Sequence, residues 1–140
     1  MSVEGNKEIA RRYCSIGAKE FKEYRETGRD DFHAPEFVFH GPSGDMSLKE
    51  YNEFMDTMVT SFPDYKYTPE DIIAEGDKVV LRYTLTGTHQ GNAMGIPPSR
   101  KKVKIEGIGI LRIGGGKLVE AWFATDALGL MQQIGAIPSQ

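Results

Sequence analysis

The hydrophobic period of the sequence changes at Tyr65, and this change limits the chain to folds that combine helices with a sheet. Between Leu48 and Phe62, apolar residues recur at steps of three and four, which is typical of one helix face. After Tyr65, apolar and polar residues alternate, as in half-buried strands. We therefore expect an α+β fold in which a curved, meandering antiparallel sheet wraps over amphipathic helices and leaves a cavity between them.

Helices are expected mainly in the first half of the chain. Residues 5–27 carry an apolar stripe that predicts one helix, and the turn-rich segment after it predicts a brief helix and a short strand ending near His40. Ser47 and Glu50 form a capping box at the start of the next helix, which Pro63 ends.

Strands are expected in the second half, in two hairpins that turn at residues 75–77 and 114–116. Alternation across the strand before His89 separates two faces. One face holds Val79, Leu81, Tyr83, Leu85 and His89, and the other Val80, Arg82, Thr84, Thr86 and Thr88. With no repeats or linkers, residues 1–140 are expected to form one domain.

The composition excludes several classes of partner. A net charge of −3 argues against nucleic acid binding, which needs a basic surface. No apolar run approaches the length of a membrane span, and the charged amino terminus is unlike a signal peptide, so a cytoplasmic protein is expected. Cys14 lies within a helical pattern and is expected to be a small packed thiol.

Asp126 is the residue on which a functional interpretation depends. By strand alternation it shares a face with Trp122, and it stands where the last strand gives way to an apolar helix over Ala127–Gln133. It can cap that helix, act as an acid/base group, or do both. A carboxylate surrounded by apolar groups, which raise its pKa toward the working pH, would indicate catalysis.

The remaining polar candidates leave several alternatives open. His33, His40 and His89 each fit a structural or surface role, and their spacing resembles no zinc pattern, so no metal is expected. No nucleophile or dinucleotide motif is present, so no cofactor is expected. Arg82 can face solvent, pair with Glu106 or Glu120, or hold an anionic oxygen in the cavity. A soft apolar lining is expected from Phe54, Met55, Met58, Met94 and Trp122.

Several segments together resemble the SnoaL-like polyketide cyclase family, also called ester cyclases, of the nuclear transport factor 2-like superfamily. They are FVFHGP, SLKEYNEFMDTMVTSFPD, TGTHQG, GIPP and DALGLMQQIGAIP, in this order along almost the whole chain. The resemblance implies a cone-shaped α+β barrel, in which a curved mixed or antiparallel sheet wraps over N-terminal helices. It also implies a homodimer or higher homo-oligomer that pairs through its sheet, and an elongated pocket for an apolar, polyketide-like small molecule. It also implies ring closure by intramolecular aldol condensation without metal or cofactor.

The resemblance also implies roles for residues. Asp126 matches the family's catalytic aspartate, a general base and then a general acid. Our own candidates for donors to the enolate are His40, as a second catalytic residue, together with His89 and Arg82. Trp122 would line the pocket and remove water from Asp126. Tyr13, Phe54 and Met55 are expected to contact the substrate. The chain departs from the family pattern at Ala124 and Thr125, where relatives carry Asn and Trp, and at Arg100, where they carry glycine.

Two other functions stay open at this point. One is a different reaction in the same cone-shaped fold, catalysed for example by an isomerase or by an epoxide-opening cyclase or hydrolase. Epoxide opening would need a second carboxylate beside Asp126, for which Glu106 and Glu120 are the candidates. The other is a non-catalytic binder of apolar ligands, in which Asp126 is only a helix cap.

Overall fold

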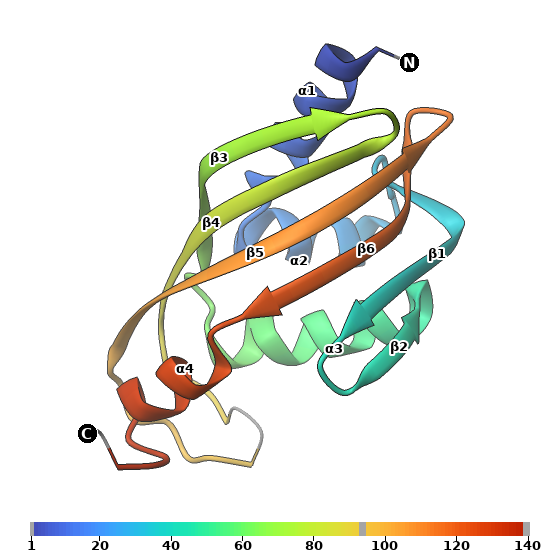
Figure 1. The fold of residues 1–140 in the computed structure, drawn as a ribbon. Coiled ribbons are helices and arrows are strands. Elements are labelled where there is room, and N and C mark those ends of the chain that lie inside the picture. Colours follow the sequence, from blue (N-terminus) through green and yellow to red (C-terminus); the bar gives the residue numbers. More distant parts are fainter. Residues whose placement is uncertain (1, 93–94, 139–140) are drawn as a thin grey trace.

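The computed structural model describes residues 2–92 and 95–138, which form helices packed on a curved sheet (Figure 1). In chain order the elements are α1 (Val3–Cys14), α2 (Ala18–Thr27), β1 (His33–Gly41), β2 (Gly44–Ser47), α3 (Leu48–Ser61), β3 (Lys66–Glu75), β4 (Lys78–Thr88), β5 (Lys102–Gly114), β6 (Lys117–Thr125) and α4 (Ala127–Gln133). The expected α+β architecture is confirmed. Within the described ranges, no helix is long and apolar enough to span a membrane.

The sheet has the strand order β2-β1-β6-β5-β4-β3. The long strands β3 to β6 form the expected antiparallel hairpins, whereas β1 pairs with β6 in parallel. The inner face packs against α1 and α3, with α1 on β3 and β4 and α3 on β1 and β2. The expected curved sheet, mixed or antiparallel, is therefore confirmed, and the pair of β1 and β6 makes it a mixed sheet.

The predicted single helix over residues 5–27 is wrong, because the chain breaks between α1 and α2. Gly17 adopts an extended conformation and caps α2, with its backbone N–H donating to the Glu20 carboxylate at 3.1 Å. The next amide, of Ala18, donates to the Tyr65 carbonyl at 3.2 Å. A Cβ on Gly17 would meet that carbonyl oxygen at 3.0 Å. A long-range contact therefore overrides the local helical pattern.

The predicted brief helix before His40 is also wrong. The Asp30 carboxylate accepts hydrogen bonds from the backbone N–H groups of Phe32 and His33, both at 2.9 Å. Such local side-chain bonds compete with helix formation. The segment forms a turn that leads directly into β1.

Other sequence predictions are confirmed. Ser47 and Glu50 form the capping box of α3 through reciprocal side-chain to backbone bonds at 3.2 and 3.1 Å. The predicted inner face of β4 is buried at Val79, Leu81, Tyr83 and Leu85. Cys14 is a buried free thiol in the same core.

Candidate functional site

A large cavity of about 710 Å³ lies between the sheet and the helices. Its walls come from α1, α2 and α3 on one side and from strands of the curved sheet on the other. Most of the lining side chains are apolar or aromatic, among them Phe39, Leu81 and Phe123. A cavity of this size and character suits a mostly apolar small molecule.

Three of the residues predicted to contact substrate line this cavity. Tyr13 comes from α1, and Phe54 and Met55 come from α3. Phe54 is 41% exposed, whereas Met55 is 7% exposed, so Phe54 lies nearer to solvent and Met55 in the interior. Met58 also lines the cavity, and Met94 lies outside the described residues.

Asp126 lies beside the cavity with an exposed side chain. Its Oδ1 accepts a hydrogen bond from the Gly129 backbone N–H at 2.8 Å, so it caps α4 as predicted. The residues on either side of it, Thr125 and Ala127, line the cavity, but Asp126 itself is not part of the wall. The apolar enclosure that would mark a catalytic carboxylate is therefore not observed around Asp126.

Trp122 and His40 lie on the outer face of the sheet, so the prediction that they face the cavity is wrong. Alternation along β6 turns Phe123 and Thr125 inward and Trp122 outward. The rings of His40 and Trp122 stack at 5.0 Å. Hydrogen bonds from the His40 ring to Glu120 and Asp45 raise the pKa of the imidazole.

Arg82 and His89 also lie outside the cavity wall, contrary to the prediction that they donate to a substrate. Arg82 projects from the outer face of β4 and donates to Asp71 at 2.6 Å, a partner other than the predicted Glu106 or Glu120. His89 is fully buried, and its Nδ1 lies 3.1 Å from the Ser99 backbone nitrogen, which donates to it. That bond makes His89 an anchor for the loop after β4.

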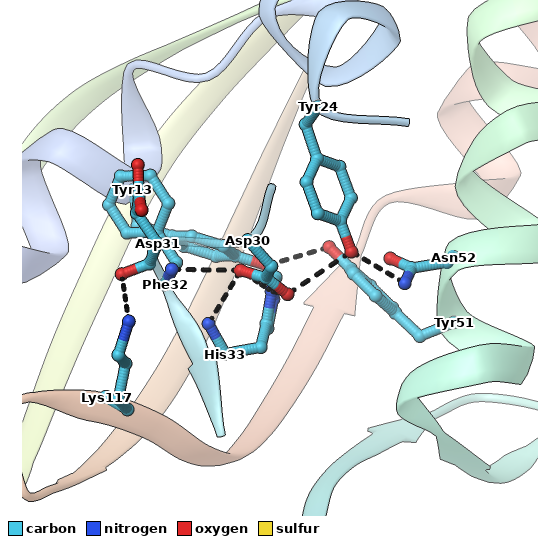
Figure 2. A network of polar contacts seen from close by, with 9 residues as sticks. All are labelled: Tyr13, Tyr24, Asp30, Asp31, Phe32, His33, Tyr51, Asn52 and Lys117. Atoms are coloured by element: carbon cyan, nitrogen blue, oxygen red, sulfur yellow. Dashed lines mark hydrogen bonds and ion pairs between the residues drawn. The ribbon is translucent and has the colours of Figure 1, made fainter. Parts of the chain in front are cut away.

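A polar cluster lies in the cavity, and apart from Tyr13 its residues are not among those that the sequence predicts for the site (Figure 2). His33, at the start of β1, bonds Asp30 through Nδ1 at 3.0 Å and the Tyr13 hydroxyl through Nε2 at 3.2 Å. The Tyr13 and Tyr51 hydroxyls are 2.8 Å apart. These four side chains all line the cavity.

Burial alone would raise the pKa of the Asp30 carboxyl, but hydrogen bonds from the His33 ring and from backbone amides lower it to about 2. Asp30 is therefore a carboxylate at neutral pH. Burial raises the pKa of both Tyr13 and Tyr51 above the ordinary phenol value, so both stay protonated. The sequence signal for this cluster is a carboxylate and an imidazole three residues apart, directly after a helix stop.

A second branch of the cluster starts from the same carboxylate. The Tyr24 hydroxyl donates to Asp30 at 3.2 Å and accepts from the Asn52 amide at 2.7 Å. This branch ties α2 and α3 to the turn before β1 (Figure 2). Across the described residues, no three His, Cys, Asp or Glu side chains gather in a way that could hold a metal ion.

Solved structures with a similar fold include one described as a hydroxylase and several described as polyketide cyclases. AclR, a candidate hydroxylase from Streptomyces galilaeus, is 27% identical with a TM-score of 0.84, over 99% of this chain and 86% of that chain. A candidate SnoaL-like polyketide cyclase from Jannaschia sp. CCS1 is 26% identical with a TM-score of 0.81, over 96% of this chain and 94% of that chain. A candidate polyketide cyclase from Acidithiobacillus ferrooxidans is 28% identical with a TM-score of 0.75, over 96% of this chain and 97% of that chain.

No curated protein matches the sequence. The family described as SnoaL-like polyketide cyclase matches residues 18–134, which include every strand, the helices α2 to α4 and all of the cavity wall except the part from α1 and Ile16. The chain therefore belongs to the SnoaL-like polyketide cyclase family.

Proposed function

We propose that this protein closes a ring in an apolar, carbonyl-rich small molecule of the polyketide type. The observation that carries the proposal is the cavity of about 710 Å³, whose wall is mostly apolar and aromatic. Such a wall binds a flat, poorly soluble ligand and excludes water from it. Membership of the cyclase family supports the reaction class.

The proposed reaction is an intramolecular aldol condensation that needs no cofactor. A general base removes a proton from a carbon between two carbonyl groups, and the resulting enolate attacks a second carbonyl of the same molecule. The new alkoxide is then protonated by a general acid. Every step is a proton transfer or a carbon–carbon bond formation, so positioned side chains suffice.

Asp126 is the proposed base. Its neighbours Thr125 and Ala127 line the cavity, so a bound substrate would pass close to its carboxylate. The bond from the Gly129 backbone N–H fixes the carboxylate orientation. Because the side chain is exposed, it can return its proton to water after each turnover.

Two observations favour alternatives to this proposal. The similarity to AclR, described as a candidate hydroxylase, favours oxygenation of the same class of substrate. The exposed capping position of Asp126 favours a protein that binds apolar ligands without turning them over.

The test is turnover of a panel of linear tricyclic polyketide esters by wild type and by Asp126→Asn, with ligand binding measured in parallel. We expect wild type to form cyclised product and Asp126→Asn to lose at least about 100-fold in kcat with binding kept, as for a missing acid/base group. Equal activity of the two proteins would remove Asp126 from the reaction. Binding without turnover in both would support the non-catalytic alternative.

A further inference from the structure

The cavity contains a continuous chain of hydrogen-bonded groups that the proposed role of Asp126 does not use. It runs from the Asp30 carboxylate through the His33 ring and the Tyr13 hydroxyl to the Tyr51 hydroxyl, and we call these four groups the His33 relay (Figure 2). The side chain of His33 is only 6% exposed and that of Asp30 is 19% exposed. The relay is thus a largely enclosed polar chain in an apolar cavity.

The direction of each hydrogen bond in the relay follows from the ionised Asp30. A carboxylate can only accept hydrogen bonds, so His33 Nδ1 carries a proton and donates a hydrogen bond to Asp30. In neutral His33, Nε2 then has a lone pair that faces the Tyr13 hydroxyl, which must donate to it. Because Tyr13 has only one proton, Tyr51 must donate to the Tyr13 oxygen.

This order leaves the Tyr51 oxygen as an acceptor for a ligand hydroxyl. When His33 gains a second proton, the bond to Asp30 stays as it is and the two bonds beyond the ring reverse. His33 Nε2 then donates to Tyr13, Tyr13 donates to Tyr51, and Tyr51 donates its own proton to a ligand oxygen. The raised phenol pKa values keep both tyrosines protonated in either state. One proton on His33 therefore decides whether Tyr51 accepts from the ligand or donates to it.

We propose that the His33 relay is a second acid/base group of this site and that it acts on an enol or ketone oxygen of the substrate. In the forward step the enol O–H bond breaks and its proton goes to the Tyr51 oxygen. Tyr51 passes its own proton to Tyr13, and Tyr13 passes its own to Nε2 of His33. The electron pair stays on the enolate, and the Asp30 carboxylate faces the new imidazolium.

The reverse sequence returns the same proton to the alkoxide that ring closure creates, so for a substrate bound as its enol protons and electrons balance without a co-reactant. Asp126 acts in the earlier step that forms this enol from the ketone: it takes the carbon-bound proton and releases it to water, and the ketone oxygen takes up a proton from water. Tyr51 is the catalytic residue of the relay because it touches the substrate oxygen, while Asp30 is a positioning residue. This inference rests on the proposed function and adds an oxygen-directed acid to it.

A row of aromatic rings connects the relay to the end of β6, next to Asp126. From Tyr51 a row of ring contacts leads to Phe39 at 4.9 Å, then to Phe123 at 5.6 Å and to Tyr83 at 5.8 Å. The Tyr83 hydroxyl bonds the hydroxyl of Thr125, the residue before Asp126. A ligand that reaches both groups is therefore an elongated aromatic or polyenic molecule with oxygen functions well separated along its length.

Binding of two matched probes tests the relay without any turnover. Naphthalene and 2-naphthol differ by one hydroxyl group, which the Tyr51 oxygen is expected to accept from. We expect Tyr51→Phe to weaken 2-naphthol by about fivefold, the value of one hydrogen bond, and to leave naphthalene unchanged. His40→Asn, at a histidine on the outer face, is the control and should change neither affinity. Equal weakening of both probes, or of neither, would overturn the proposal.

Turnover of the polyketide ester panel tests the proton transfer itself. Tyr13→Phe keeps the ring and its packing but interrupts the relay between His33 and Tyr51. We expect Tyr13→Phe and His33→Asn each to lower kcat by about 100-fold with little change in KM, and the double variant to be no slower than either. Additive losses, or an unchanged kcat in Tyr13→Phe, would overturn the relay.

The two experiments also separate this inference from the proposed function. A wild type that converts no member of the panel would contradict ring closure, while the naphthol comparison would still decide whether Tyr51 bonds a ligand hydroxyl. Conversely, cyclised product from wild type with full activity in Tyr13→Phe would keep the function and remove the relay.

Discussion

Asp30 is the residue that organises the polar part of the cavity, because it accepts from two backbone amides, the His33 ring and the Tyr24 hydroxyl. Removing its charge would leave His33 without the partner that fixes its tautomer. The same bonds hold the turn that starts β1. The proposed role of Asp30 in the relay and its structural role in the turn therefore depend on the same carboxylate.

The lowered pKa of Asp30 predicts a pH-dependent contribution to stability. A carboxyl with a folded-state pKa of about 2, below its ordinary value of 3.8, stabilises the protein above pH 4, and the contribution is lost as the pH falls toward 2. We expect about 1 to 2 kcal/mol after allowing for solvent screening. Urea unfolding of wild type and Asp30→Asn should differ most at pH 5 to 7 and converge toward pH 2. A difference that stays constant with pH would contradict the assignment.

At the scale of elements, the sequence is most informative where one local pattern determines the structure. The capping box and apolar face of α3, and the two hairpins of β3 to β6, depend on neighbouring residues and were predictable for that reason. The break at Gly17 depends on a hydrogen bond from Ala18 to Tyr65. The parallel pairing of β1 with β6 joins two strands that are far apart in the sequence. No local pattern contains either contact.

The same distinction explains the candidate site. Alternation along β6 separates Trp122 from Phe123 and Thr125, but alternation alone cannot say which of the two faces points into the cavity. The His33 relay joins side chains from α1, α3, β1 and the turn before it, so only the folded chain brings them together. Tyr13, Phe54 and Met55 were predictable as lining residues because helical apolar faces point to the interior.

Arg100 shows how one departure from the family pattern is accommodated within an element. It has a φ of 61°, a left-handed conformation that glycine adopts without a steric cost. The glycine implied by the family resemblance at this position therefore has a backbone reason. Here the loop keeps its shape through hydrogen bonds between His89 and residues 99–101.

For the whole molecule, the outer face of the sheet carries an apolar band that fits the expected homodimer. Ile73, Val80, Ile110 and Trp122 are register partners in a row across β3 to β6. Ile108, in the next row, is 52% exposed, and Ile73 is 64% exposed. Apolar side chains in a continuous row on a sheet face are a typical contact surface between protein chains.

This band makes a prediction about assembly. We expect wild type to be a dimer and Ile108→Lys to be a monomer, because the lysine charge would have to be buried within the contact. Light scattering after size-exclusion chromatography measures the mass directly. Val3→Lys is the matched control, since Val3 is 37% exposed on α1 and lies away from the sheet face. An unchanged mass in Ile108→Lys would show that chains do not meet at this band.

The most direct test of ring closure in the cavity is product analysis of wild type and Ala127→Trp on the same polyketide esters. Aldol closure gives a product with the mass of the substrate and a new chromatographic retention. Ala127 is exposed and lines the cavity, so a tryptophan there should fold, as a thermal melt can verify, yet obstruct access. We expect wild type to form the isomeric product and Ala127→Trp to form at least about tenfold less. Equal amounts of product from both proteins would contradict ring closure in the cavity. A wild type that binds the esters but forms no product would contradict it as well.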